Sequence, residues 1–360
     1  MPPTNITEFK NILIIKPSAA GDIVCALPIL SALRDKYPSA RISWLINSTL
    51  AGLLRGHPMI DELIEFDRRR YGYLAHSWAV TKRFMSFLRK LRTARFDLVL
   101  DLQGLFRSGF LAWTTQSPVR IGPAERREMG WVFYTHRCPA RPTDTHIVDR
   151  IATAGELLGL DVSEPRFCLP IRQEARDRTG ELLKSAGLDG AEKYLAIAPG
   201  GTWPSKRWPV ENFVELARKV TTELDLPVVV VGGRTERRLG EQMVEVLADR
   251  RVVSLAGRTD LPELLAVLDG ACGLVCNDSG PMHMAVALNR PVTAIIGPTN
   301  PCRTGPYRRP ESVVKSGIDC SPCYKRQCVR VAEGSLPPCM AQIRVEEVFN
   351  NLAARLATCA

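Results

Sequence analysis

The sequence predicts an α/β protein built from two doubly wound domains in series, and three observations support this. Apolar runs of strand length alternate with segments of helical periodicity along most of the 360 residues. Successive positions within the runs are apolar, which is typical of parallel sheets covered by helices on both faces. A stretch rich in proline and charge at 161–180 interrupts the alternation, which then begins again, so we interpret it as a linker.

Each half contains its own set of expected strands. In the first half they cover 11–16, 40–47, 60–66 and 96–103. In the second half they cover 193–200, 226–233, 252–257, 272–278 and 291–298. We expect two Rossmann-like domains followed by a helix that crosses back onto the first domain, at 1–170, 171–345 and 346–360. Ligands of such sheets bind at the carboxyl ends of strands, so a site is expected in a central cleft between the domains.

The composition of the chain indicates its cellular compartment. No apolar run approaches the roughly 20 residues needed to span a bilayer, and the first ten residues lack the layout of a secretory signal. We therefore expect a cytoplasmic protein whose 11 cysteines are mostly reduced residues of the core.

Positive charge is concentrated in the first half. Residues 1–150 hold 22 Lys and Arg against 13 Asp and Glu, a net charge of +9, whereas the whole chain carries +10. This distribution favours an anionic partner for the N-terminal half, whether a phosphorylated substrate, an anionic membrane or nucleic acid.

A glycine turn follows the first expected strand. Gly21 permits a tight turn, and Asp22 falls at the start of the next helix. In isolation this carboxylate would be interpreted as a helix N-cap. Its place at a strand end also suits a general base that removes a proton from an attacking hydroxyl.

A second turn joins a strand ending at Asp278 to a helix that starts near Gly280. Backbone N–H groups at a helix start, approached closely because glycine has no side chain, form a site for a pyrophosphate. His283, one turn into the helix, is placed to donate to the same anion. The simpler interpretation is capping by Asp278 or Ser279, with His283 on the surface.

A third loop, at 198–213, places Lys206 between Trp203 and Trp208. A lysine held there would neutralise a leaving diphosphate. For any single lysine, however, a solvated surface position is the commoner outcome.

Together these segments resemble glycosyltransferase family 9, the ADP-heptose:lipopolysaccharide heptosyltransferases, over residues 11–350. The resemblance rests on K-x-S-x-x-G-D at 16–22, D-L-Q-G-L-F-R-S at 101–108, K-R-W-P at 206–209 and N-D-S-G-P-x-H at 277–283. It implies a GT-B fold, an inverting mechanism that requires no metal or cofactor, and an ADP-heptose donor bound mainly by the C-terminal domain.

The resemblance also implies residue roles. Asp22 matches the catalytic base, and Lys206 matches a lysine at the donor phosphates that we also count as catalytic. Glu236 matches an acidic residue that binds the nucleotide ribose. The full set of expected donor-binding residues is Gly201, Thr202, Lys206, Glu236, Asp278, Ser279, Gly280 and His283.

The family's acceptor is a lipid A bearing acidic core sugars at the inner face of the membrane, which agrees with the basic first half. The expected acceptor-binding residues are Ser18, Gly21, Gln103, Arg107, Arg126 and Arg127. Arginines bind acidic sugars through paired hydrogen bonds, and we interpret 125–141 as a loop over the cleft.

A basic amphipathic segment at 68–95 holds nine Lys or Arg and no acid. Its apolar residues recur at helical spacing, at Val80, Phe84, Leu88 and Leu91. We expect this stripe to pack on the domain and the basic face to remain available to acceptor or membrane.

Four cysteines near the C-terminus, Cys320, Cys323, Cys328 and Cys339, have spacings that permit a structural zinc site. A second C-x-x-C pair is missing, and we favour reduced thiols or a redox-labile pair over zinc. A similar C-S-P-C segment occurs in the family branch that adds the second heptose, so the resemblance favours a heptosyltransferase II-like subtype.

The sequence therefore predicts a monomeric cytoplasmic enzyme of the glycosyltransferase class, EC 2.4, associated peripherally with the inner membrane. It moves heptose from ADP-heptose to the Kdo/heptose inner core of lipopolysaccharide. Two alternatives stay open: a GT-B transferase that uses another nucleotide sugar, and a basic nucleic-acid-binding protein. The second is disfavoured because the sequence has no recognisable zinc-finger or RNA-binding aromatic motif.

Overall fold

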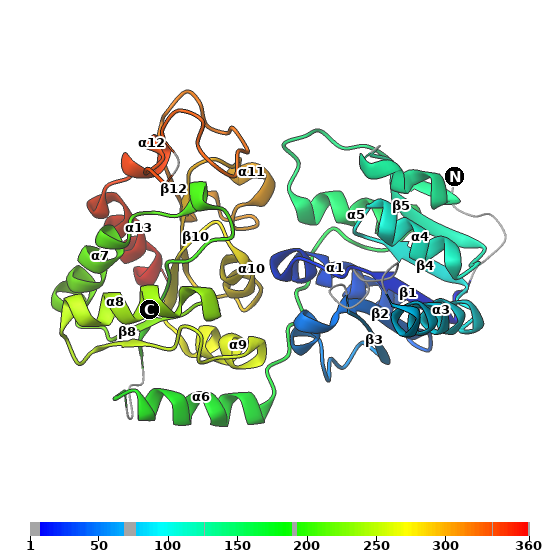
Figure 1. The fold of residues 1–360 in the computed structure, drawn as a ribbon, viewed down its shortest axis with the longest axis horizontal. Coiled ribbons are helices and arrows are strands. Elements are labelled where there is room, and N and C mark those ends of the chain that lie inside the picture. The colour runs from blue at the N-terminus through cyan, green and yellow to red at the C-terminus, as the bar shows by residue number, and fades with distance from the viewer. Residues whose placement is uncertain (1–7, 68–76, 126, 189–192, 333, 359–360) are drawn as a thin grey trace. The chain divides into compact units, whose positions relative to one another are not determined.

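The structure is a computed structural model in which residues 8–67, 77–125, 127–188, 193–332 and 334–358 are described (Figure 1). The chain divides into two compact units, residues 1–170 and 171–360. Each unit is an α/β domain with one six-stranded parallel sheet.

The sheet of the N-terminal unit has the order β3-β2-β1-β4-β5-β6. Its strands are β1 (Asn11–Ile15), β2 (Arg41–Asn47), β3 (Glu62–Phe66), β4 (Leu98–Asp101), β5 (Val119–Pro123) and β6 (His136–Cys138). All neighbouring pairs are parallel. Strands β5 and β6 were not predicted, because charged residues and a proline interrupt their short apolar runs.

Helices cover both faces of this sheet. Ile12 and Ile14 are as fully buried as Leu13 and Ile15, and successive strand residues point to opposite faces. Helices α3 (Trp78–Thr93) and α4 (Phe106–Thr114) share one core cluster with the sheet. Helices α1 (Ala20–Lys36) and α5 (Ile147–Leu157) pack against each other, and η1 (Ser48–Leu53) and η3 (Arg127–Phe133) are short 3-10 segments.

Helix α3 is the amphipathic helix predicted within 68–95. Leu91 is fully buried, and Leu88 packs against the same cluster, so the expectation that the apolar stripe packs on the domain is confirmed. The first part of the predicted segment, 68–76, lies outside the described residues.

The sheet of the C-terminal unit has the order β12-β11-β10-β7-β8-β9. Its strands are β7 (Leu195–Ala198), β8 (Val228–Val230), β9 (Val252–Ser254), β10 (Gly273–Asn277), β11 (Val292–Ile296) and β12 (Val313–Lys315). The pairs are again parallel. Only β12, a three-residue edge strand, was not predicted.

The helices of this unit are α6 (Gln173–Ser185), α7 (Val210–Glu223), α8 (Arg237–Leu247), α9 (Leu261–Gly270), α10 (Gly280–Ala287), α11 (Pro301–Thr304), α12 (Pro338–Ala341) and α13 (Val345–Ala357). Short 3-10 segments are η4 (Pro204–Lys206), η5 (Arg234–Glu236) and η6 (Pro310–Ser312). The predicted linker at 161–180 is therefore too long, because α6 already begins at Gln173.

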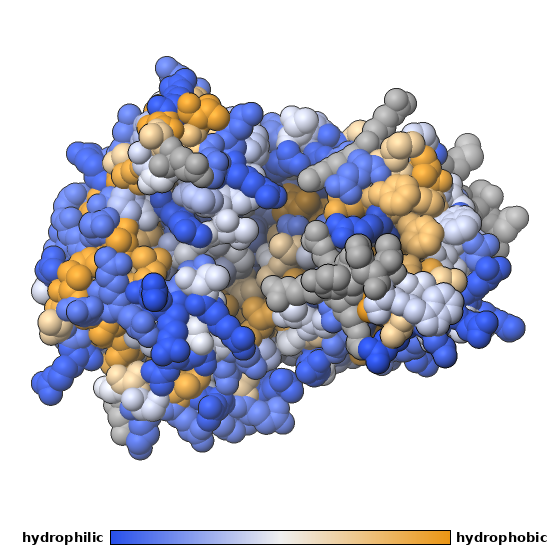
Figure 2. All heavy atoms as spheres, in the orientation of Figure 1, coloured by the Kyte–Doolittle hydropathy of each residue, from blue (hydrophilic) through white to orange (hydrophobic). Residues whose placement is uncertain are grey.

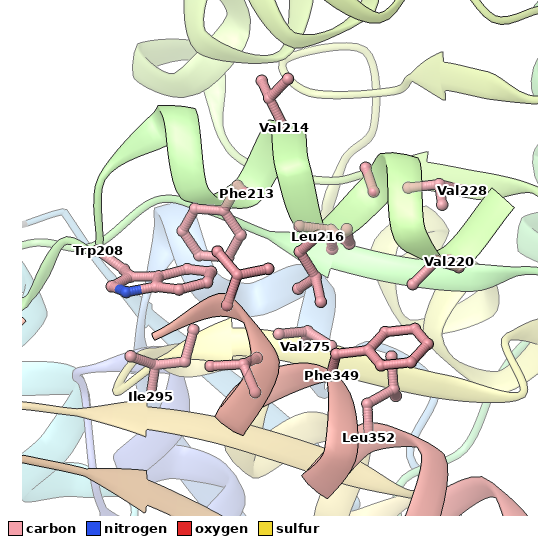
Figure 3. Packing of buried hydrophobic residues seen from close by; sticks show 14 of the residues in the cluster. Trp208, Phe213, Val214, Leu216, Val220, Val228, Val275, Ile295, Phe349 and Leu352 are labelled. Carbon is pink, nitrogen blue, oxygen red and sulfur yellow. The ribbon is translucent and has the colours of Figure 1, made fainter. Parts of the chain in front are cut away.

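The position of the C-terminal helix also differs from the prediction. Its apolar face, with Val348, Phe349 and Leu352, belongs to the core cluster that contains Phe213 of α7 and Ile295 of β11 (Figure 3). Helix α13 therefore packs on the C-terminal unit, and the prediction that it packs on the first domain is wrong. The physical reason is that its single apolar stripe is already buried against α7 and the sheet of its own unit.

None of the helices in the described part of the chain is both long enough and apolar enough to cross a membrane.

Candidate active site

The two sheets share one strand order, and each has a switch point between its first and fourth strands. These pairs are β1 with β4 and β7 with β10. At a switch point, the loops that follow the two adjacent strands run to opposite faces of the sheet. The crevice between these loops, at the carboxyl ends of the strands, is where such sheets bind ligands. Asp22 and Gln103 follow β1 and β4, and Lys206 and Asp278 follow β7 and β10.

Asn277, the fully buried last residue of β10, connects the loops of the C-terminal switch point. Its side-chain amide donates to the carbonyls of Pro199 and Gly200 at 2.7 and 3.1 Å. Its Oδ1 accepts the backbone N–H of Trp208 at 3.1 Å. The sequence analysis gave this residue no role, although a polar amide at the end of an apolar strand is a usable signal.

Lys206 and Asp278 form an ion pair in which Nζ lies 2.8 Å from Oδ2. The two side chains are only 16% and 5% exposed. The same carboxylate oxygen accepts the hydroxyls of Thr299 at 2.6 Å and Thr304 at 3.4 Å. The ammonium also lies 4.7 Å from the ring centroid of Trp203. The interpretation of Lys206 as a solvated surface lysine is therefore wrong.

Helix α10 begins without a capping side chain. Ser279 occupies the N-cap, but its hydroxyl donates to the carbonyl of Asn277 at 3.1 Å. Asp278 bonds to Lys206 instead of the helix start, so the capping interpretation is wrong. Gly280 is the first helical residue, and His283 is half-buried one turn later. The start of α10 therefore has no side-chain cap, and the backbone N–H of Gly280 is placed where a helix can bind an anion.

Glu236 lies against the glycine turn after β7. A Cβ at Gly200 would come within 2.5 Å of its Cγ, and a Cβ at Gly232 within 2.8 Å of its Cβ. Its carboxylate accepts the N–H of Gly233 at 2.8 Å and the hydroxyl of Thr235 at 2.9 Å. Because Gly200 and Gly232 have no side chains, the side chain of Glu236 can reach the end of β7.

The turn before η4 carries two further predicted residues. Gly201 is buried and Thr202 is exposed, and Arg207 Nε donates to the carbonyl of Gly201 at 2.9 Å. A cavity of about 620 Å³ opens beside this turn, lined in part by Trp208 and Glu236. A larger hollow of about 780 Å³ lies along α8 and β9 and contains none of the predicted site residues, so we place the site at the strand-end loops.

Asp22 is the third residue of α1 and not its N-cap, which is Ala19, but its carboxylate still bonds to the helix start as in a capping box. Its Oδ2 accepts the N–H of Ala19 at 3.4 Å and lies 3.7 Å from Lys16 Nζ. The Asp22 side chain is 44% exposed, whereas that of Lys16 is 4% exposed. An incoming hydroxyl can therefore reach the carboxylate.

Lys16, beside Asp22, had no role in the sequence-based prediction. Its Nζ donates to the carbonyl of Leu102 at 3.0 Å, so it connects the loops after β1 and β4. A lysine directly after a fully buried apolar strand is the signal that predicts such a role.

The turn after β4 is organised by Asp101, which is fully buried. Its carboxylate accepts the hydroxyl of Tyr134 at 2.6 Å and the N–H groups of Gln103 and Gly104 at 2.9 and 3.1 Å. Burial raises the pKa of Asp101, against the effect of these hydrogen bonds. The turn presents half-buried Gln103.

The other acceptor candidates lie in the same unit. Ser18 is half-buried in the loop after β1, Gly21 is buried in α1, and Arg107 is exposed on α4. Arg127 begins η3, and Arg126 lies outside the described residues. Since 125–141 contains η3 and β6, its interpretation as one loop is wrong.

Three of the four C-terminal cysteines lie within electrostatic reach of the fourth, Cys339. Burial raises the pKa of the Cys339 thiol to about 11, and charge on Cys323, Cys320 and Cys328 adds to the rise. Among the described residues, no three His, Cys, Asp or Glu side chains are placed to hold a metal ion.

We predict that protein purified without immobilised metal contains far less than one zinc per chain, because no three potential ligand side chains converge in the described part of the chain. Elemental analysis together with thiol titration measures this, with a Cys320→Ser/Cys323→Ser variant as the control. A content of about one zinc per chain that disappears in the variant would contradict the prediction.

Comparison with known proteins decides the family. The profile of glycosyltransferase family 9 (heptosyltransferase) matches residues 84–332. The chain belongs to glycosyltransferase family 9. This glycosyltransferase is 28% identical to the lipopolysaccharide core heptosyltransferase OpsX of Haemophilus influenzae over 308 residues, covering 85% of this chain and 84% of the relative.

Solved structures agree on the fold of this glycosyltransferase. A family 9 glycosyl transferase from Veillonella parvula superposes with a TM-score of 0.80 at 25% identity, over 98% of each chain. The ADP-heptose lipopolysaccharide heptosyltransferase II of Escherichia coli gives 0.75 at 24% identity, over 97% of this chain and 99% of that one. The predicted GT-B class is therefore confirmed. Relatives named heptosyltransferase 1 and heptosyltransferase 2 both match, so the comparisons do not separate these subtypes.

Proposed function

We propose that this glycosyltransferase moves heptose from ADP-heptose to the Kdo/heptose inner core of lipopolysaccharide, with inversion at the anomeric carbon. The observation that carries the proposal is the buried Lys206–Asp278 pair beside the uncapped start of α10. This combination is suited to the diphosphate of a nucleotide sugar. The names of the relatives, lipopolysaccharide heptosyltransferases that include an ADP-heptose enzyme, support this donor and acceptor.

The C-terminal unit would hold the donor through its strand-end loops. The N–H groups at Gly280 and the ammonium of Lys206 bind the diphosphate, with Ser279, His283, Gly201 and Thr202 completing the contacts. Glu236 accepts hydrogen bonds from the ribose hydroxyls. Asp278 orients Lys206 through the 2.8 Å contact.

The N-terminal unit would supply the base and the acceptor contacts. The acceptor hydroxyl oxygen attacks the anomeric carbon on the face opposite the diphosphate, and the bond from that carbon to the diphosphate breaks. The hydroxyl proton passes to Asp22, and ADP departs with the electron pair, stabilised by Lys206. Lys16 positions Asp22, and no metal or cofactor is required in this scheme.

The acceptor would be an anionic lipid A–core molecule at the cytoplasmic face of the inner membrane. Ser18, Gly21 and Gln103 lie around the Asp22 turn, and Arg107 lies on the helix that follows β4. Arg107, Arg126 and Arg127 would bind the acidic sugars. The protein would act as a peripheral monomer, and nucleic acid is not its partner.

We predict that ADP raises the melting temperature of the protein at lower concentration than UDP or GDP, because only a ligand of the native state stabilises it. Thermal-shift titration of the three nucleotides measures this. A turnover assay with ADP-heptose and a Kdo-bearing lipid A acceptor then tests the reaction. Stabilisation by UDP or GDP alone would instead indicate a transferase for another nucleotide sugar.

A further inference from the structure

Exposed apolar side chains gather on α4 and η3 of the N-terminal unit. Phe106, Trp113, Met129 and Val132 are 49%, 46%, 59% and 45% exposed, and Figure 2 shows hydrophobic residues over this part of the surface. Phe133 joins them, since its ring centroid lies 5.2 Å from that of Phe106 and 6.4 Å from that of Trp113. These five residues form the α4–η3 patch.

The patch is a fixed part of the fold. A Cβ at Gly109 would lie 2.7 Å from the carbonyl oxygen of Gly130, and a Cβ at Gly130 would lie 2.9 Å from the backbone of Leu105. The two glycines therefore let α4 and η3 pack with their backbones in contact. Phe110 packs below the patch, 6.3 Å from Phe133 between centroids, and against the core cluster of the unit. The patch is therefore packed against the core of the unit on one side and exposed to solvent on the other.

Positive charge is concentrated on the helix next to α4. Helix α3, which packs beside α4, carries five Lys or Arg and no acidic residue. Lys90 pairs with Glu62 at 2.8 Å. The other four, which are exposed and form no ion pair within the described residues, are Lys82, Arg83, Arg89 and Arg92.

We propose that the α4–η3 patch and the basic face of α3 together dock the N-terminal unit on an anionic lipid bilayer. Aromatic rings are favoured at the level of lipid headgroups, and neighbouring cations are attracted to the anionic phosphates. A duplex nucleic acid fits less well, because its contact surface is a continuous run of phosphates that would meet an apolar centre. This inference rests on the proposed function, whose acceptor is a membrane lipid.

The test is co-sedimentation of the full chain, without donor, with vesicles of phosphatidylethanolamine and phosphatidylglycerol, with vesicles of phosphatidylcholine, and with anionic vesicles to which lipid A is added. The apolar variant is Trp113→Ser/Val132→Ser and the charge variant is Lys82→Gln/Arg83→Gln. Matched controls on α8 are Val246→Ser, whose side chain is 55% exposed, and Arg238→Gln. The ADP affinity of every variant is measured as well, to check that its C-terminal unit is folded.

We expect wild type to bind anionic vesicles and each patch variant to bind them about tenfold more weakly, since both apolar insertion and charge contribute. Both controls should bind as wild type does, and ADP affinity should not change. Unchanged binding by the patch variants would overturn the proposal. So would wild-type binding that appears only when lipid A is added, which would assign the patch to the acceptor's acyl chains. Vesicle binding is measured without heptose transfer, so a negative transfer assay would not change it. Membrane docking and heptose transfer can therefore be disproved independently.

Discussion

Replacement of Asp22 with alanine is expected to lower kcat by about 10²–10⁴-fold, the usual contribution of a general base. The carboxylate is 44% exposed at the switch point of the N-terminal sheet, so its loss removes the proton acceptor without opening a cavity in the core. Donor affinity should stay unchanged, because the proposed donor contacts all lie in the C-terminal unit. Steady-state kinetics with a separate titration of ADP measure both quantities.

The matched control is Asp144→Asn, an exposed aspartate of the same unit, which should keep wild-type activity. Lys16 adds a second comparison. Lys16→Met should reduce kcat less than Asp22→Ala does, since it only misplaces the base, but should destabilise the unit by loss of the bond to Leu102. Activity of the Asp22→Ala variant within about tenfold of wild type would exclude the role of general base.

Replacement of Lys206 with methionine is expected to weaken ADP binding by about 10–100-fold, the effect of losing a hydrogen bond to a charged group. It should also lower stability by about 3 kcal/mol, because Asp278 is only 5% exposed and would lose its cation. Isothermal titration with ADP and denaturant unfolding measure the two effects.

A second variant separates stability from binding. In Lys206→Met/Asp278→Asn the buried charge is removed together with its partner, so much of the lost stability should return. ADP affinity should stay low, because the phosphate-binding ammonium is still absent. Recovery of ADP affinity in the double variant would contradict direct binding of the diphosphate by Lys206.

The order of strands and helices in most of both units could be predicted from the sequence alone. Periodicity of apolar residues is a local property, so the long central strands and the α3 stripe could be predicted without tertiary contacts. The short strands β5, β6 and β12 could not, because three to five residues with charges or proline lack a periodic pattern. Each of these short strands is stabilised by pairing with a neighbouring strand, which is a tertiary contact.

The sequence also places the candidate site residues at strand ends. Asp22, Lys206 and Asp278 stand directly after predicted strands or in the loops that follow them, which brings them to the carboxyl edge of their sheets. Local spacing could not choose between capping and catalytic roles for Asp22 and Asp278, because both roles favour an acid at a helix start.

Tertiary contacts show which partners these carboxylates have, because those partners are distant in the chain. Asp278 accepts bonds from Lys206 and Thr299, which lie 72 and 21 residues away, and so does not cap α10. Asp22 stands beside Lys16, whose bond to Leu102 spans 86 residues. The same is true of α13: its apolar stripe predicts a buried helix, but the surface that buries it is known only once α7 and β11 are in place.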